Sequence, residues 1–251
     1  MTSAMAAIVE LRDIRKSFGR NEVLRGISLV LAKGTTLAVM GGSGQGKTVL
    51  LRIADGLIRP DSGEVILFGT HIEHMSEEAV LPLRRRAGFV FQNAALFDSL
   101  SVFENVAFPL REHARLGEGE ITDRVHRFLS LVGLPGTDDL LPSELSGGMR
   151  KRVGIARALV TEPEVVFFDE PTAGLDPTNA RLVAELIAEL RTGVCDTAIV
   201  VTHDIEFADL VADQMAIIHQ GRFAEVGTPA EIHHSSNPDV RKFLAGELRA
   251  T

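Results

Sequence analysis

The sequence predicts an α/β fold, in which a mainly parallel core sheet carries an N-terminal antiparallel β-subdomain and a helical subdomain. Strand-like and helix-like segments alternate in the second half of the chain, which is typical of a parallel sheet covered by helices. In the first seventy residues short strands follow one another, and between residues 92 and 163 only helical patterns occur. We therefore expect a single domain over residues 1–251, with the helical subdomain inserted at about 93–163.

Runs of β-branched and other apolar residues mark the expected strands. They cover residues 7–11, 23–31, 35–40, 64–68, 88–91, 164–168, 197–202 and 214–219. Apolar residues at helical spacing mark the expected helices, at residues 47–57, 121–131, 147–160, 178–190, 205–212 and 238–248. Turn signals at residues 32–34 and 60–63 favour antiparallel hairpins in the N-terminal part.

The composition is that of a globular chain, with 45% hydrophobic and 24% charged residues. A formal net charge of -8 argues against a surface for nucleic acid, which needs clustered Lys and Arg. Two basic runs, residues 84–86 and 150–152, are each predicted to form a solvated helix face. Cys195 is the only cysteine, which predicts a structural thiol in a reducing cytoplasm. Since the chain has neither a signal-peptide pattern nor an apolar run of about 18 residues, we expect it to be soluble and intracellular.

A glycine-rich loop, GGSGQGKT at residues 41–48, stands between an expected strand and an expected helix. Its glycines let the backbone curl so that N–H groups point at phosphate oxygens, next to the positive end of the helix. Lys47 is expected to bridge the β- and γ-phosphates, and the Thr48 hydroxyl to bind Mg²⁺. A merely flexible glycine loop would not explain the Lys and the Thr, so the pattern predicts a P-loop that binds the phosphates of a nucleotide.

Two adjacent carboxylates, Asp169 and Glu170, follow an apolar strand in VVFFDEPTAGLDP. Adjacent strand residues point to opposite faces, so one carboxylate can face a metal while the other meets the attacking water. This assigns Asp169 to Mg²⁺, commonly through water, and Glu170 to the general base. A solvated strand end is the usual explanation of such a pair alone, but the strand and the P-loop favour the functional interpretation.

A second glycine-rich turn, LSGGM, opens the expected helix at residue 147. Ser146 would be a good helix N-cap, which is the structural alternative. Two glycines directly after the cap are costly for a helix start chosen for stability alone. They favour a backbone that lies close to an anion, with Ser146 and the free N–H groups offered to a phosphate.

The order GGSGQGKT, Gln92, LSGGM, FFDEPTAGLDP and His203 in VVTHD resembles the ATP-binding-cassette (ABC) family over essentially the whole chain. The resemblance implies a head-to-tail homodimer. In it, Ser146, Gly147 and Gly148 of one copy complete the nucleotide site that the P-loop of the other copy forms. Asp176 would lie at the dimer seam.

Further roles come from this resemblance alone. It implies that Phe18 stacks on adenine, although an isolated Phe would otherwise be assigned to the core. It implies that Gln92 touches Mg²⁺ and the attacking water and links the site to a transmembrane partner. It implies that His203 contacts the γ-phosphate, although a lone His after a strand is ordinarily a satisfied polar residue.

Together these inferences predict an ATPase, an ABC-type translocase, with ATP and Mg²⁺ as its cofactors. The predicted catalytic residues are Lys47, Gln92, Glu170 and His203. The predicted magnesium ligands are Thr48, Gln92 and Asp169. The predicted nucleotide-binding residues are Phe18, Gly41, Gly42, Ser43, Gly44, Gln45, Gly46, Lys47, Thr48, Val49, Ser146, Gly147, Gly148 and Asp176.

Two segments, LSGGMRKRVGIARAL and NAALFDSLSVFENVAFPLREH, resemble the ATPases of Mla, or MCE-associated, phospholipid transporters. That resemblance implies a peripheral position on the cytoplasmic face of the inner membrane. It also implies a multispan permease, whose coupling helix would enter a groove formed largely by residues 93–113, and an MCE-domain substrate-binding protein. Some members bind a STAS-domain regulator and use a longer C-terminal tail to grip the neighbouring subunit. The sequence ends at Thr251 without that tail, so neither the tail contact nor the regulator is a firm expectation.

Two other functions stay open from the sequence. One is the ATPase of an ABC importer for a polar solute such as an amino acid. The other is a soluble ABC ATPase acting on ribosomes or DNA. Proteins of that last class usually carry two cassettes or a long coiled-coil insertion, which this sequence lacks, and the acidic charge also counts against it.

Overall fold

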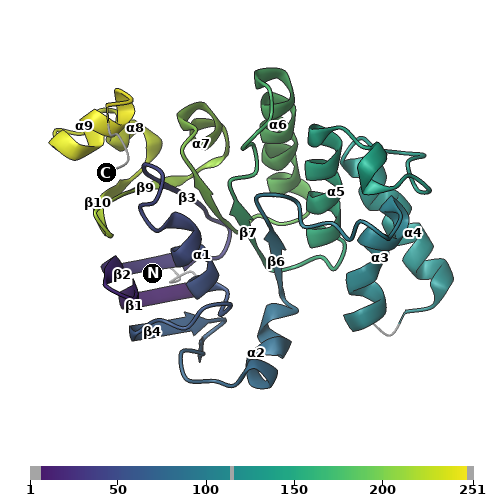
Figure 1. The fold of residues 1–251 in the computed structure, drawn as a ribbon, viewed down its shortest axis with the longest axis horizontal. Helices are drawn as coiled ribbons and strands as arrows, with labels where there is room; N and C mark the ends of the chain where they lie inside the picture. The colour runs from purple at the N-terminus through teal and green to yellow at the C-terminus, as the bar shows by residue number, and fades with distance from the viewer. Residues whose placement is uncertain (1–6, 114–115, 248–251) are drawn as a thin grey trace, which may run out of the picture. The chain divides into compact units, whose positions relative to one another are not determined.

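The computed structural model describes residues 7–113 and 116–247. The chain forms two compact units, which Figure 1 shows in one ribbon. The first unit comprises Met1–Arg84 and Asp196–Thr251, and the second comprises Arg85–Cys195. The expected single domain with an insertion at 93–163 stays a prediction.

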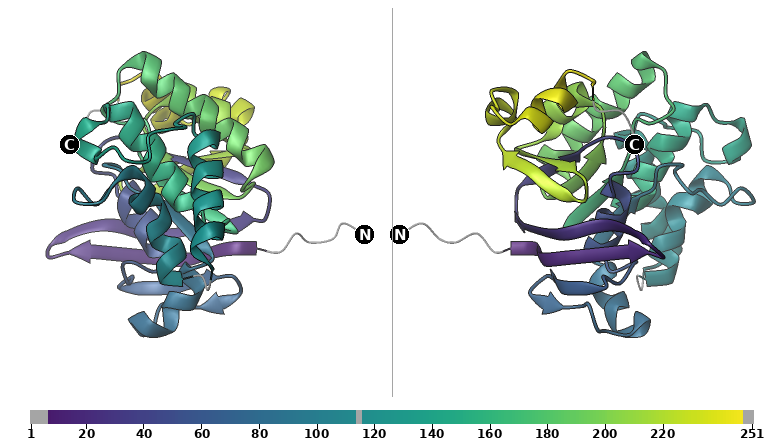
Figure 2. Two further views of the ribbon diagram at one scale, coloured as in Figure 1. Left: turned by 90° about the vertical axis from the view of Figure 1, so that its right-hand side faces the viewer. Right: turned by 60° about the vertical axis from the view of Figure 1, so that its left-hand side comes forward.

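The N-terminal part of the first unit is an antiparallel sheet, as predicted. Its strands are β1 (Ala7–Phe18), β2 (Asn21–Ala32), β4 (Ser62–Leu67) and β5 (Thr70–His71), in the order β2-β1-β4-β5. Figure 2 shows β1 and β2 as a long pair running side by side. The tight turns of this sheet contain Gly19 and Gly69, whose φ angles of 62° and 75° suit glycine.

The predicted hairpin turns were wrong. Residues 32–34 lead from β2 into β3 (Thr36–Met40), which pairs in parallel with β8 (Ala198–Thr202) and β9 (Gln214–His219) in another sheet. Residues 60–63 follow a helix, not a strand. Both segments contain turn-forming residues, but each joins elements that are not paired with each other.

The core of the first unit is built around β3. The strand order is β10-β9-β3-β8, with β10 (Arg222–Gly227) antiparallel to β9. All five residues of β3 and all five of β8 are buried, as expected for parallel strands covered by helices. The helices of this unit are α1 (Lys47–Ala54), α2 (Glu77–Arg84), α7 (Ile205–Val211), α8 (Pro229–His233) and α9 (Pro238–Leu244).

The second unit contains one parallel strand pair and a group of helices. The pair is β6 (Ala87–Val90) with β7 (Val165–Asp169). The helices are α3 (Val102–His113), α4 (Glu118–Leu131), the short 3₁₀ helix η1 (Pro142–Glu144), α5 (Gly147–Leu159) and α6 (Pro177–Gly193). Helix α5 packs against α3, α4, α6 and β6. Within the described residues from 92 to 163 the structure has no strand, as predicted.

Several elements were missed or misjudged in length. Helices α2 and α3 contain Pro82 and Pro109, which interrupt the helical pattern of the sequence. Strand β10 has no fully buried residue and therefore gives little apolar signal. The C-terminal helix, expected over 238–248, ends at Leu244, and Leu248 lies outside the described residues. No helix in the described part of the chain is long and apolar enough to span a bilayer.

Candidate active site

The phosphate loop, residues 41–48, connects β3 to α1 in the first unit. Helix α1 begins at Lys47, and Gly46 is its N-cap with a left-handed φ of 94°. Because Gly46 has no side chain, no side-chain oxygen of the N-cap residue lies at the helix start, and the backbone can come close to an anion there. Thr48 and Val49 lie in that first turn, and Ser43 and Gly44 are exposed in the loop.

Lys47 is buried and bound to its own loop. Its side chain is only 7% exposed, and its ammonium donates to the carbonyl oxygens of Gly41 at 2.8 Å and Gly42 at 3.1 Å. A buried ammonium has to be solvated by protein groups. These two carbonyls keep the ammonium inside the curled loop, where it could bind a phosphate.

Gln45 has a structural contact that the sequence did not suggest. Its side-chain oxygen accepts a hydrogen bond from the backbone N–H of Gln220 at 2.7 Å. Gln220 lies in the tight turn between β9 and β10 and has a φ of 49°. Gln45 therefore joins the phosphate loop to that turn, in addition to its predicted place at the nucleotide.

His203 leaves the sheet beside the phosphate loop. Met40 at the end of β3 pairs with Thr202 at the end of β8, so the residues that follow them leave adjacent parallel strands at the same edge. Ligands of α/β proteins bind at this carboxyl edge. His203 is exposed, and Asp204 next to it caps α7 by accepting from the N–H of Phe207 at 3.0 Å. The structure thus brings His203 to the edge where the phosphate loop begins.

Phe18 stands at the end of β1 and is not a core residue. Its side chain is 51% exposed, and the ammonium of Lys16 lies 5.5 Å from the ring centroid. A half-exposed aromatic ring offers apolar surface on which a ligand can pack. This geometry fits the predicted contact with adenine better than it fits the alternative of a core Phe.

The two carboxylates lie at the end of β7 in the second unit. Asp169 is the last residue of the strand and is 1% exposed, whereas Glu170 is 9% exposed and has a φ of 47°. Because Glu170 is outside the strand and in a left-handed conformation, strand alternation does not set its direction. A strained backbone of this kind is typical of functional sites. The direction of the Glu170 side chain therefore depends on this turn and not on the pleat of the strand.

Gln92 and these carboxylates leave neighbouring strands. Val90 of β6 pairs with Phe168 of β7, so Gln92 follows one strand as Asp169 and Glu170 follow the other. Gln92 is exposed. The second unit therefore gathers three of the predicted site residues at one sheet edge.

The second glycine-rich turn is a capped helix start. Ser146 is the N-cap of α5, and its hydroxyl accepts from the N–H of Met149 at 3.2 Å. Gly148 is buried, and a Cβ atom there would lie 2.7 Å from Oδ1 of Asn179 in α6. Close packing of two helices is thus one reason for this glycine. Gly147 is partly exposed and has no such crowded contact with a polar group.

Asp176 caps the neighbouring helix. It is the N-cap of α6 and accepts from the N–H groups of Thr178 and Asn179, both at 3.1 Å. The Asn179 side chain also donates to it at 2.6 Å, and these bonds lower the pKa of Asp176. Asp176 is exposed, so it can serve both this cap and the predicted dimer seam.

The prediction of a solvated helix face at residues 150–152 was wrong. Lys151 is 6% exposed and donates to the backbone carbonyls of Gln92 and Glu170, in the latter case at 3.3 Å. Arg152 donates to the carbonyls of Val132 and Gly133. The run of charges is visible in the sequence, but the carbonyl groups that these side chains bind lie far away in the chain. The local sequence pattern therefore could not predict them.

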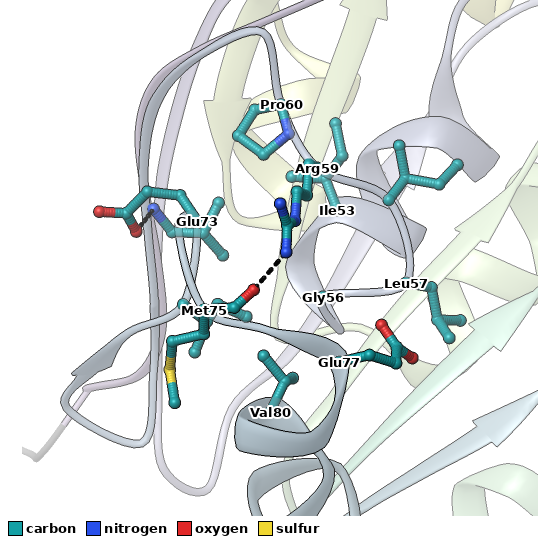
Figure 3. Close-up of a pocket in the computed structure, with 12 residues that line it drawn as sticks. Ile53, Gly56, Leu57, Arg59, Pro60, Glu73, Met75, Glu77 and Val80 are labelled. Carbon is teal, nitrogen blue, oxygen red and sulfur yellow. Dashed lines mark hydrogen bonds between the residues drawn. The ribbon is translucent and has the colours of Figure 1, made fainter.

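A pocket of about 300 Å³ opens in the first unit near the end of α1 (Figure 3). Apolar side chains such as Ile53 and Val80 line much of it, and Arg59 donates to the carbonyl oxygen of Met75. Its lining contains no residue of the phosphate loop. The pocket is therefore a feature separate from the predicted nucleotide contacts of this unit.

Comparison with known proteins gives the same family as the motifs. The family model described as ABC transporter matches residues 24–173. The chain is 39% identical to the intermembrane phospholipid transport system ATP-binding protein MlaF of Escherichia coli K12, over 98% of this chain and 91% of that protein. It is 41% identical to the protein TRIGALACTOSYLDIACYLGLYCEROL 3 of Arabidopsis thaliana, over 96% of this chain and 74% of that one. It is 39% identical to the probable ribonucleotide transport ATP-binding protein mkl of Mycobacterium tuberculosis H37Rv, over 96% and 67%.

Solved structures of ATP-binding cassettes are similar to this chain in fold and in sequence. The ATP-binding cassette MJ0796, in a dimeric post-hydrolysis state with ADP and Pi, matches with a TM-score of 0.80 and 29% identity over 88% of this chain and 98% of that one. The cassette cbiO1 of Clostridium perfringens matches with a TM-score of 0.82 and 31% identity over 96% and 99%. The chain therefore belongs to the ABC transporter family, as an ATP-binding and ATP-hydrolysing subunit.

Proposed function

We propose that this chain powers phospholipid transport of the Mla, or MCE-associated, type, as a homodimer bound to a permease on the cytoplasmic face of the inner membrane. One observation carries the proposal: the similarity to MlaF extends over 98% of this chain and 91% of that protein. The plant relative is also named after a lipid. A similarity of this extent includes the segment at residues 93–113, which we propose receives the coupling helix of the permease.

A second candidate is an importer of a polar solute. The mycobacterial relative named for ribonucleotide transport is as similar in sequence as MlaF, at 39% identity. This chain covers 67% of that protein, against 91% of MlaF. The lipid function is favoured because the match leaves little of MlaF unaccounted for.

The residues of the first unit are proposed to hold the nucleotide. The turn of helix α1 with Lys47 and Thr48 would receive the β- and γ-phosphates, Phe18 would stack on adenine, and His203 would contact the γ-phosphate. This assignment is supported by the glycine N-cap of helix α1, the half-exposed ring and the common sheet edge.

The residues of the second unit are proposed to act on water and metal. Glu170 would orient and deprotonate the attacking water, and Asp169 and Gln92 would supply oxygen ligands for Mg²⁺. Bound Mg²⁺ would neutralise charge that develops on the phosphates. All of these donors are oxygen atoms, which Mg²⁺ prefers, and Mg²⁺ usually keeps several waters when a nucleotide is present.

Dimerisation is proposed to depend on ATP. Ser146, Gly147 and Gly148 of one copy would close over the nucleotide of the other, with Asp176 at the seam, and hydrolysis would release them. Besides the second copy and the permease, an MCE-domain protein is the proposed third component, and a STAS-domain regulator a further one. Nucleic acid is not among the proposed partners.

The proposal is tested by reconstitution. The proteins that co-purify with the chain from membranes are identified, and with a co-purified permease and MCE-domain protein the ATP-dependent movement of a fluorescent phospholipid out of vesicles is measured. Glu170→Gln should lower the turnover of ATP by about 100-fold or more while ATP still binds and traps the dimer. Movement of ribonucleotides in place of phospholipid would favour the second candidate, and normal turnover in Glu170→Gln would remove Glu170 from its role.

A further inference from the structure

Lys151 carries a buried ammonium group and has none of the roles proposed above. Its side chain is 6% exposed, and its donations to the carbonyls of Gln92 and Glu170 join segments 59 and 19 residues away in the chain. Burial lowers the pKa of Lys151, and the charges of Glu170 and Asp169 oppose that effect. A buried charge is tolerated only where protein groups solvate it. Moving either carbonyl away from the Lys151 ammonium would therefore cost free energy, which favours the observed positions of both.

One face of α5 holds the loop that contains Gln92. Arg157 donates to the carbonyls of Ala94 at 2.8 Å and Ala95 at 2.9 Å, and both alanines have positive φ angles, 59° and 48°. Between the two cations stands Gly154, where a Cβ atom would lie 3.0 Å from the Cβ of Ala94. Residues three apart in a helix share one face, so Lys151, Gly154 and Arg157 all face this loop. The two cations bind the strained loop by hydrogen bonds, and the helix packs closely against it at Gly154.

The backbone of Glu170 is held in the same way. Its carbonyl oxygen accepts from Lys151 and also from the N–H of Ala173 at 3.1 Å, and its φ of 47° is unfavourable for a residue with a side chain. Such a conformation persists only where its surroundings fix it. Lys151 thus contributes to the fixed direction of the Glu170 side chain.

We infer that Lys151 is a positioning residue that ties the loop of Gln92 to the backbone of Glu170, so that displacement of this loop displaces the general base. The inference rests on the proposed role of Glu170 and adds a second link to it. Gln92 was expected to signal through its side chain, whereas this link runs through its backbone carbonyl. A permease pressing on the loop would then alter hydrolysis without altering the phosphate loop.

The first test separates turnover from binding. Lys151→Met removes the ammonium and keeps a long apolar side chain. We expect kcat to fall on the order of tenfold, as for loss of charged hydrogen bonds at one site, while KM and the Kd for ATP change less than about twofold. Lys151→Arg should restore part of kcat, since a guanidinium can also donate to two carbonyls.

Arg152→Met is the matched control. Arg152 lies on the same helix and also donates to two backbone carbonyls, those of Val132 and Gly133, which belong to the end of α4. This variant should lose similar thermal stability and keep its kcat. If both variants lose kcat equally, or Lys151→Met raises KM in proportion, Lys151 is only structural and the inference is wrong.

The second test needs no activity. Hydrogen exchange should rise together around residues 92–95 and 170–173 in Lys151→Met, because the N–H groups of Ala94 and Ala173 are bonded within these two turns. In Arg152→Met it should rise only near residues 132–134. No joint rise in Lys151→Met would overturn the inference. Unaltered ATP turnover in Glu170→Gln would instead overturn the proposed function, so the two failures are distinct.

Discussion

Helices α1 and α5 each follow a glycine-rich turn, and each carries a buried lysine bound to two backbone carbonyls. Lys47 is 7% exposed and binds carbonyls five and six residues away, inside its own loop. Lys151 is 6% exposed and binds carbonyls in two distant segments. A lysine whose partners lie in its own loop can exchange them for a phosphate without separating distant segments, whereas a lysine that joins distant segments fixes them. The same chemistry thus suits the proposed ligand-binding group in one helix and the inferred structural tie in the other.

The two helix starts differ in a related way. Gly46 leaves the first turn of α1 without a side-chain cap, whereas Ser146 caps α5 through the N–H of Met149. A side-chain cap stabilises the helix start that has it, so α5 has a stabilising contact that the Gly46 N-cap does not supply to α1.

The largest expected effect is on the phosphate loop. Lys47→Ala removes the charge that is proposed to face the phosphates, so we expect turnover to fall by about 100-fold or more and ATP affinity to fall as well. Calorimetry of ATP binding and a phosphate-release assay measure the two effects. Lys151→Met is the comparison, since it should reduce turnover and spare binding. Equal loss of binding in both variants would erase the difference between the two lysines.

The sequence was informative where function depends on neighbouring residues. The phosphate loop, its strand and its helix were predicted because they form one short, continuous motif whose contacts are local. Lys151 was missed because its partners, Gln92 and Glu170, are distant in the chain and are bound through carbonyls that every residue has.

Two further misses have the same origin. The direction of Glu170 was attributed to strand alternation, but the strand ends one residue earlier and the backbone turns there. The turns at residues 32–34 and 60–63 were recognised, yet a turn signal does not say which elements will pair. The strand that follows residues 32–34 finds its partners, β8 and β9, more than 150 residues later.

An intermediate effect is expected at Gly148, where packing and phosphate contact are competing explanations. Gly148→Ala should destabilise the chain by roughly 1–3 kcal/mol, because the new Cβ meets Asn179. Adding Asn179→Ala makes room and should restore much of the melting temperature. If turnover returns with stability, Gly148 serves packing alone. If stability returns and turnover does not, the backbone of Gly148 has to come close to a phosphate.

Asn179→Ala by itself is the control for that pair. It removes the bond from Asn179 to Asp176, measured at 2.6 Å, while the N–H caps of α6 stay in place. We expect a small loss of stability and near-normal turnover. A large loss of turnover in this single variant would assign the effect to Asp176 and the dimer seam.

The last prediction concerns the stability of the chain and a buried carboxyl group. Asp55, at the end of α1, is 4% exposed, and among the described residues its Oδ1 has no hydrogen-bond partner. Burial raises the pKa of the Asp55 carboxyl from 3.8 to about 7, against the opposing charge of Arg84. The Asp55 carboxyl therefore binds its proton more tightly in the folded chain than in the unfolded chain. Its contribution to stability is full below the unfolded pKa and is lost as the pH rises through about 7.

Asp55→Asn removes that titration. The free energy of unfolding of the wild type should fall relative to Asp55→Asn by roughly 2 kcal/mol between about pH 5 and pH 8, a difference that urea titrations at the two values would measure. The pH dependence carries the test, since an amide can change the absolute stability through its own contacts. An equal gap at both values would mean that Asp55 is solvated in the folded chain. In that case the contrast with Lys47 and Lys151, whose carbonyl partners make burial of their charge tolerable, would not hold.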